Sequence, residues 1–141
     1  MTIRMAILGL AVALPLAALA AAPGDADGDG IPDALDKCTL DSRNAAPGAN
    51  CDTDSDGYGN VCDPDFDQNF AVNANDFARY FTPSFKSHVP ASTGTDLNCD
   101  GSVKKDDHEQ FFVPKFKGDA KLGSAVPGPS GLPCAGTPGC M

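Results

Sequence analysis

Apolar residues gather in three short stretches of the chain, and long polar segments separate them. Residues 1–22 are almost continuously apolar, whereas residues 77–85 and 111–116 place aromatic side chains four positions apart. A spacing of four residues puts side chains on one face of a helix. The pattern therefore predicts two short amphipathic helices in the second half of a chain that otherwise shows little sign of regular structure.

Each aromatic stretch contains one proline, Pro83 in the first and Pro114 in the second. Because proline lacks an N–H and its ring crowds the preceding turn, we expect these residues to kink or end the helices, so that regular helix reaches only about residues 82 and 113. The aromatic side chains are predicted to form a shared core, with an exposed partner-binding face as the alternative. These side chains are Phe77, Tyr80, Phe81, Phe85, Phe111, Phe112 and Phe116.

Residues 1–22 have the order of a secretory signal peptide. Arg4 precedes the apolar run, and Ala18 and Ala20 form a small-residue pattern typical of cleavage sites. An uncleaved membrane anchor is the alternative, although an alanine-rich run is a poor spanning helix. We therefore expect a secreted protein, extracellular or periplasmic, without membrane insertion once the signal is removed.

Composition argues against a conventional hydrophobic core. The 141 residues carry a formal net charge of −9, and residues 25–76 hold 13 acidic groups against 2 basic ones. Leu, Ile, Val and Phe make up about 17% of residues 23–141, below the roughly 20% under which a charged chain tends to stay disordered. Such acidity disfavours nucleic acid or an anionic membrane as a partner and favours cations.

One spacing of oxygen ligands occurs four times, with ligands at positions 1, 3 and 5 and a carboxylate at position 12. We name these segments loop one (25–36), loop two (52–63), loop three (65–76) and loop four (96–107). Calcium takes six to eight oxygens at about 2.3–2.6 Å, and alternate residues of a curled loop can point at one centre. The predicted Ca²⁺ ligands are Asp25, Asp27, Asp29, Asp33, Asp36, Asp52, Asp54, Asp56, Asp63, Asp65, Asp67, Asn69, Asp76, Asp96, Asn98, Asp100, Ser102 and Asp107.

The four loops are not equivalent. Loop four has the fullest set, with Gly101 at position 6 and Val103 at position 8, and is predicted to be the strongest site. Phe70 occupies position 6 of loop three, where a positive φ costs a residue with a Cβ about 1 kcal/mol or more. Pro32 at position 8 of loop one has no N–H to donate. A flexible Asp/Gly-rich linker is the alternative interpretation, but four copies in register favour calcium.

An internal duplication relates loops three and four. Residues 65–87 and 96–118 share seven identities at an offset of 31, and each copy is a loop followed by a helix, without an entering helix. The predicted fold is small, irregular and mainly α, stabilised by calcium and disulfides. The expected domains are a signal peptide (1–22), a loop-rich segment (23–63), the duplicated loop-helix segment (64–118) and a tail (119–141).

Six cysteines form an even set, as expected in an oxidising compartment. Cys134 and Cys140 are close enough in sequence for a local disulfide within a Pro/Gly-rich tail that we expect to be flexible, although a link to the body is also open. With a local pair, Cys99 would bond Cys51 or Cys62. A zinc site is disfavoured because the chain has no C-x-x-C spacing.

Two families share these motifs. Residues 25–63, with DADGDGIPDALDKC and DTDSDGYGNVCD, resemble a thrombospondin type 3 repeat, which implies Asp-rich loops around calcium. That resemblance implies a Cys38–Cys62 bond, with Cys38–Cys51 still open. Residues 65–117 resemble a dockerin, a family that binds cohesin modules on scaffolding proteins. The resemblance implies that loop positions 10 and 11 help recognise cohesin; these are Ala74, Asn75, Lys105 and Asp106.

The sequence thus favours a secreted, non-catalytic calcium-binding module whose ion-ordered surface mediates protein interaction or adhesion. His88 and His108 are the only imidazoles, and neither has the neighbours of a catalytic site. The alternative is a dockerin that docks onto a cohesin in a polysaccharide-degrading assembly. A passive extracellular calcium sink is a third possibility.

Overall fold

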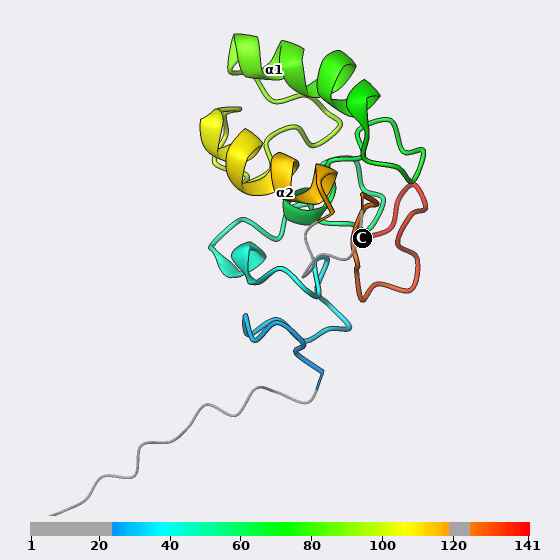
Figure 1. Cartoon of the computed structure of the whole chain (residues 1–141). Coiled ribbons are helices and arrows are strands. Elements are labelled where there is room, and N and C mark those ends of the chain that lie inside the picture. Colours follow the sequence, from blue (N-terminus) through cyan, green and yellow to red (C-terminus); the bar gives the residue numbers. More distant parts are fainter. Residues whose placement is uncertain (1–23, 119–124) are drawn as a thin grey trace, which may run out of the picture.

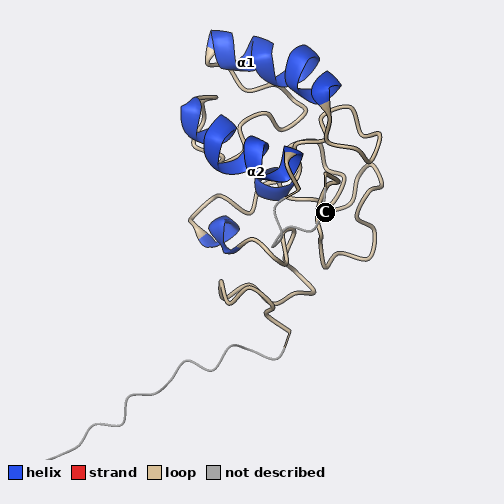
Figure 2. Ribbon diagram, viewed as in Figure 1, coloured by secondary structure: helices blue, strands red, loops and turns tan. Residues whose placement is uncertain are grey.

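The protein is described here by a computed structural model that covers residues 24–118 and 125–141. Within these ranges the chain forms helices and loops but no strand (Figure 2). Two short 3-10 helices, η1 (Ser42–Ala45) and η2 (Asn60–Cys62), interrupt the N-terminal loops. The signal peptide predicted for residues 1–22 lies outside the described residues. No helix in the described ranges is long and apolar enough to span a bilayer.

Two longer helices follow loops three and four and appear green and yellow-orange in Figure 1. Each contains a π-helical segment that continues as an α-helix. The first consists of η3 (Asp76–Phe81) and α1 (Thr82–Ser87). The second consists of η4 (Asp107–Phe112) and α2 (Val113–Phe116).

The prolines do not end these helices, so the expected limits near residues 82 and 113 are wrong. Pro83 and Pro114 lie in the first turns of α1 and α2. The Thr82 N–H donates to the carbonyl of Phe77, five residues earlier, which is the π-helical pattern. This wider turn changes the hydrogen-bond pattern just before the proline. The proline, which has no N–H, then lies in the first turn of an α-helix, where the missing donor is tolerated.

The core is built from equivalent positions of the duplicated units. Position 2 of the loop, position 8 of the loop and the following helix each contribute one buried pair: Phe66 with Leu97, Val72 with Val103, and Phe81 with Phe112. The Phe66 ring stacks on Phe81 and Phe112, with centroids 6.3 and 6.1 Å away. The two units therefore close on one another through matching side chains.

Only part of the predicted aromatic core is buried. Phe81, Phe111 and Phe112 are buried, whereas Phe77, Phe85 and Phe116 are 39%, 36% and 42% exposed. The exposed rings continue the stack outward, since Phe85 lies 5.9 Å from Phe81 and Phe116 lies 5.8 Å from Phe112. The helices thus present an aromatic face to solvent as well as to the core.

Three disulfides connect the loops. Cys38–Cys62 joins the ends of loops one and two, as the family resemblance implies. Cys51–Cys99 joins the start of loop two to loop four. Of the two partners considered for Cys99, Cys51 and Cys62, the structure therefore has Cys51. Cys134–Cys140 closes a short loop near the C-terminus.

Residues 125–141, which we name the strap, are packed against the loops, so the expectation of a flexible tail is wrong for this segment. The strap is the orange-to-red segment of Figure 1. Its Ala125 carbonyl accepts from Val72 N–H at 2.9 Å, and Gly131 N–H donates to the Asp36 carbonyl at 2.9 Å. Its glycines and prolines allow close backbone contact rather than disorder.

Candidate calcium sites

All four loops share one backbone arrangement around the aspartate at position 1. The N–H groups of positions 5 and 6 donate to its two carboxylate oxygens. The position-6 bonds measure 3.1 Å for Gly30–Asp25, 3.0 Å for Gly57–Asp52, 2.6 Å for Phe70–Asp65 and 2.8 Å for Gly101–Asp96. The repeated spacing in the sequence therefore corresponds to a repeated local fold.

Position 6 has a positive φ in every loop. Gly30, Gly57 and Gly101 each have φ of 93°, a conformation that glycine adopts without a Cβ clash. Phe70 is forced to the same turn with φ of 64°. Loop three is thus folded like the others in spite of its phenylalanine, at the conformational cost that the sequence predicts.

The structure brings three carboxylates together in each of loops one, two and three. One oxygen from each member lies within 4.8 Å of the others in three clusters: Asp25, Asp27 and Asp29; Asp52, Asp54 and Asp56; Asp65, Asp67 and Asp76. Oxygens that ligate one calcium at about 2.3–2.6 Å lie within roughly 5 Å of each other. The three clusters therefore have the dimensions of a calcium shell.

Unpartnered oxygens in these loops provide a test of the fit. Buried carboxylate oxygens without a hydrogen-bond partner occur in Asp27, Asp29, Asp36, Asp67 and Asp76. A buried carboxylate oxygen without a donor or cation is costly. Two charges 4.8 Å apart also repel by about 3.5 kcal/mol at an effective dielectric constant of about 20. The residues present thus fit a bound cation, because it would satisfy these oxygens and remove the repulsion.

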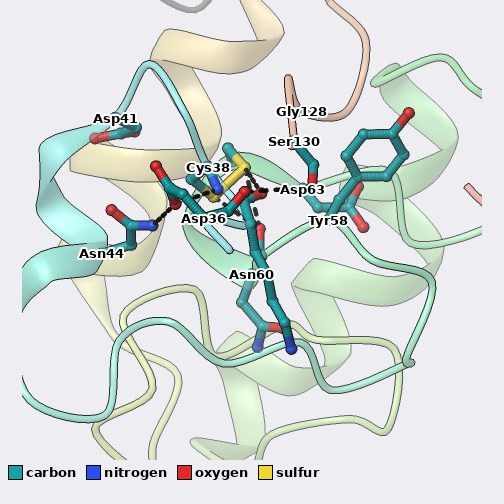
Figure 3. The surroundings of a disulfide bond; sticks show 12 residues. Asp36, Cys38, Asp41, Asn44, Tyr58, Asn60, Asp63, Gly128 and Ser130 are labelled. Carbon is teal, nitrogen blue, oxygen red and sulfur yellow. Dashed lines mark hydrogen bonds between the residues drawn. A yellow bond between two sulfur atoms is a disulfide. The ribbon is translucent and has the colours of Figure 1, made fainter. Parts of the chain in front are cut away.

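Loop one closes on Asp36, which is 1% exposed. Its Oδ1 accepts from Cys38 N–H at 2.8 Å and from the Asn44 side-chain amide, as Figure 3 shows, while its Oδ2 is unpartnered. Asp33 accepts from Ala26 N–H at 2.8 Å through Oδ1. Asn44, from η1, was not among the predicted site residues, because it lies beyond position 12 and no loop spacing identifies it.

Loop two closes on a buried aspartate that also bonds loop three. Asp63 at position 12 is 5% exposed, and its Oδ1 accepts from Asp65 N–H at 3.1 Å, which joins loop two to loop three. Burial, and then the charges of Asp56 and Asp54, raise the pKa of Asp63 well above its usual value. Lys37 Nζ lies 3.5 Å from Asp52 Oδ2 and forms an ion pair with this loop.

The pKa values of the other clustered aspartates are raised as well. Burial is the largest cause for Asp27, Asp56 and Asp65, and the charges of neighbouring aspartates add to it, so the pKa of each carboxyl is about 6. Burial also raises the pKa of Asp54 and Asp76. These carboxyls hold protons at a pH where isolated aspartates are ionised, as expected when anionic ligands converge without their cation.

Loop three keeps its closing aspartate open toward the cluster. Asp76 is fully buried, and its Oδ2 accepts from Asn73 N–H at 2.8 Å. Its Oδ1 and the Oδ1 of Asp67 are unpartnered. Asn69 at position 5 is exposed and uses its backbone N–H to bond Asp65 at 3.2 Å.

Loop four differs because its own backbone saturates the closing aspartate. Asp107 Oδ1 accepts from Leu97 N–H at 2.8 Å and from Asn98 N–H at 3.2 Å, and Oδ2 accepts from Lys104 N–H at 2.8 Å. Asp96, Asp100 and Asp107 do not form a three-carboxylate cluster in the described structure. The loop with the fullest ligand sequence is therefore the one that does not gather its carboxylates.

The remaining ligands predicted for loop four are also engaged. Lys104 Nζ lies 3.0 Å from Asp100 Oδ2, and this ammonium lowers the pKa of Asp100. Ser102 Oγ donates to Asp100 Oδ1 at 3.0 Å, and the Asn98 amide donates to Asp106 at 3.1 Å.

The two histidines pack outside the clusters. The His108 ring lies 5.5 Å from the Phe77 ring and 6.2 Å from the Phe112 ring. His88 Nδ1 lies 3.0 Å from the Val103 carbonyl, so it ties the end of α1 to loop four.

Comparison with known proteins agrees with this division. A family model of the thrombospondin type 3 repeat matches residues 23–45 and 51–77, a range that contains all three clusters and excludes loop four. No family match supports the dockerin resemblance, and no curated protein or solved structure matches the chain. Residues 23–45 and 51–77 therefore match the thrombospondin type 3 repeat, a calcium-binding module found in extracellular proteins.

Proposed function

We propose that this protein is a secreted, non-catalytic calcium-binding module whose ion-ordered surface mediates protein interaction or adhesion. The observation that carries the proposal is the set of buried, unpartnered carboxylate oxygens in loops one and three. Export is supported by the leader-like residues 1–22 and by the six cysteines, all of which are paired.

The proposed ligands are the clustered aspartates of loops one to three together with their closing residues Asp36, Asp63 and Asp76. Calcium would supply positive charge and oxygen coordination at these points. The carboxylates converge from segments with few apolar side chains, so the free energy of ion binding is coupled to the folding of the loops. Loop four is proposed as a weaker site, because binding there must first open the bonds that hold Asp107.

The aromatic face supports a role in contact with another protein. Phe77, Phe81, Thr82, Phe85 and His108 line a cavity of about 180 Å³ between the two helices. Exposed phenylalanines around an apolar cavity are typical of interaction surfaces and are not needed by a passive calcium sink. Because the helices continue directly from loops three and four, ions in the loops would also fix the position of this face.

Thermal unfolding tests the calcium part of the proposal. The oxidised protein is melted with saturating calcium and with excess chelator, and circular dichroism reports the loss of structure. We expect calcium to raise the melting temperature by more than about 10 °C, the shift that roughly 2 kcal/mol or more of binding energy gives a domain of this size. Equal melting temperatures would contradict the proposal.

A second candidate function is the dockerin-like docking onto a cohesin. The observation that favours it is the duplicated loop-helix unit, in which both helices follow Asp-closed loops. Pull-down with cohesin modules in calcium, repeated with Asp96→Ala and Asp107→Ala, tests it. Capture that depends on calcium and on these residues would favour docking, and no capture would leave the adhesive role.

A further inference from the structure

We infer that the strap, residues 125–141, is a positioning element for the calcium sites of loops one and two, an inference that rests on the proposed calcium binding. The expected tail is far from these loops in sequence, yet it crosses both of them. In Figure 3 its residues Gly128 and Ser130 lie beside Asp63 and the Cys38–Cys62 bond. The strap would hold the loop backbones in the shape that calcium needs.

The first step is that the strap bonds to the backbone of the ligand residues themselves. Gly131 N–H donates to the carbonyl of Asp36, and Gly136 N–H donates to the carbonyl of Asp56 at 2.6 Å. Both acceptors belong to aspartates that are candidate ligands. A shift of either peptide would move the carboxylate that it carries.

Loop two receives further bonds from the strap around its tightest turn, including one from Gly139 N–H to the Ser55 carbonyl at 2.6 Å. Ser130 Oγ donates to the Gly57 carbonyl at 2.7 Å, and Cys140 N–H donates to the Ser55 carbonyl at 2.9 Å. These carbonyls flank Asp56 on both sides. The strap therefore fixes the peptides on which the position-5 ligand stands.

The contact is too close for ordinary side chains at several points. A Cβ on Gly131 would overlap the carbonyl of Asp33, and a Cβ on Gly128 would lie 2.5 Å from the ring of Tyr58. A Cβ on Gly57 would overlap the sulfur of Cys140. Glycine is required on both sides of this interface, which is evidence of a specific fit.

The strap is itself anchored at both ends. The Cys134–Cys140 bond closes its C-terminal loop over loop two. At the other end Gly128 N–H donates to the Cys62 carbonyl at 3.1 Å, and the fully buried Lys115 donates its ammonium to the Gly128 carbonyl. The duplicated unit has Ser84 where this unit has Lys115, so the lysine serves the strap rather than the repeat.

These contacts have a consequence for calcium binding. A segment that orders both loops before the ion binds reduces the conformational entropy that the loops lose on binding. Calcium affinity therefore rises. Because one strap contacts both loops, an ion in either loop favours the ordered strap and thereby favours binding in the other. The strap thus couples loops one and two, which the Cys38–Cys62 bond already brings together.

Site-resolved titration tests the inference. The position-6 amides of Gly30, Gly57 and Phe70 bond the position-1 carboxylates, so their ¹H–¹⁵N signals report loops one, two and three separately. The test variant is Gly131→Ala in the oxidised protein; Gly131 does not have a positive φ, so alanine probes the close contact alone. Pro138→Ala, at an exposed strap position, is the matched control.

We expect Gly131→Ala to weaken calcium binding in loops one and two by at least about tenfold and in loop three by less than about threefold. Ser130→Ala removes the 2.7 Å bond to the Gly57 carbonyl and only a 3.5 Å contact to the Asp36 carbonyl. It should therefore weaken loop two by about threefold and loop one by less. Hydrogen exchange of the Gly57 amide without calcium should accelerate in both variants.

Two results would overturn the inference: unchanged affinities in both variants, or an equal loss in all three loops, which would indicate general destabilisation. Failure of the proposed function looks different, because the unmodified protein would then show no calcium-dependent shift of any reporter. The control Pro138→Ala should reproduce the unmodified affinities.

Discussion

Loops three and four are copies of one unit, and their first halves form the same hydrogen bonds. In both, the position-5 N–H donates to the position-1 carboxylate at 3.2 Å, and position 6 adopts a positive φ. They diverge at position 12. Asp76 leaves one buried oxygen unpartnered, whereas both oxygens of Asp107 accept backbone N–H groups of their own loop.

A second difference between the copies is an exchange of two side chains. In loop three the Asn75 amide donates to the Asp67 carboxylate, and in loop four the Asn98 amide donates to the Asp106 carboxylate. The bond between positions 3 and 11 is retained while its charged member changes sides. In loop four the negative charge has moved out of the ligand position, which removes one reason for calcium to bind there.

Ligand spacing alone therefore does not decide which loop is arranged to bind an ion. What matters is whether the loop's own donors already satisfy the ligand oxygens. Loop three holds carboxylates together at the cost of unpartnered oxygens and a raised pKa, and loop four avoids both through Asp107 and Lys104. The first arrangement needs a cation and the second does not.

The largest effect is expected from removing the closing aspartates. Asp76→Ala should weaken calcium binding in loop three by at least about 100-fold, because a ligand without a substitute is lost. Asp107→Ala should instead destabilise the protein by about 2–3 kcal/mol with or without calcium, since it leaves three backbone N–H groups without an acceptor. Urea unfolding and calcium titration of both variants check this, and identical behaviour would break the comparison.

A large effect is also expected from pH. Because Asp27, Asp56 and Asp65 have pKa values of about 6 in the calcium-free fold and near 4 when unfolded, the folded state binds more protons between these values. Calcium-free stability should therefore rise as pH falls from 7 to 5. Calcium affinity should fall over the same range, because protons compete for the ligands.

Denaturant unfolding at pH 5, 6 and 7, with chelator and with calcium, measures both trends. If the stability measured with chelator decreased as the pH was lowered from 7 to 5, this result would contradict the raised pKa values. The Gly101 signal should require more calcium than the Phe70 signal at each pH, since loop four holds its aspartates through its own donors.

A smaller effect is expected from Lys104, whose counterpart in loop three is Asn73. Lys104→Asn should strengthen calcium binding in loop four by about threefold to tenfold, because it frees Asp100 from the ammonium 3.0 Å away and removes a competing charge. Lys105→Asn is the control, since that lysine pairs with Glu109 outside the ligand set. An equal gain in both variants would mean that only net charge matters.

The smallest effect is expected at position 6 of loop three. Phe70→Gly should stabilise the loop by about 1 kcal/mol through relief of the positive φ. Part of this gain is offset, because the Phe70 ring lies against Gly136 of the strap. The thermal unfolding midpoint measures the net effect, and a clear loss of stability would show that the ring contact outweighs the strain.

The local geometry of the loops could be predicted from the sequence. Which loops gather unpartnered carboxylate oxygens could not. Spacing identified position 1 and the positive φ of Phe70, because both follow from a short segment of chain. Loop four was predicted to be the strongest site from its ligand residues. The bonds from Leu97 and Asn98 to Asp107 depend on how the loop closes, which the sequence pattern does not show. Asn44 was not predicted as a site residue for a similar reason, since a buried side-chain contact from a 3-10 helix leaves no periodic pattern in the sequence.

Long-range packing was the other limit of prediction. The strap was expected to be flexible from its glycines and prolines, yet Gly128 and Gly131 are required by close contact with loops one and two. Pro83 and Pro114 were expected to kink or end the helices, so that regular helix would reach only about residues 82 and 113. The helices instead continue past both prolines, and a π-helical segment precedes each of them. In both cases composition described the local tendency correctly and tertiary contact decided the outcome.

The most direct test of the account is a calcium titration of the oxidised protein followed through the amides of Gly30, Gly57, Phe70 and Gly101. We expect the signals of Gly30, Gly57 and Phe70 to shift together at low calcium and the Gly101 signal to shift only at clearly higher concentration. If Gly101 shifts first, or if none of the four responds, then loops one to three are not calcium sites of the kind described.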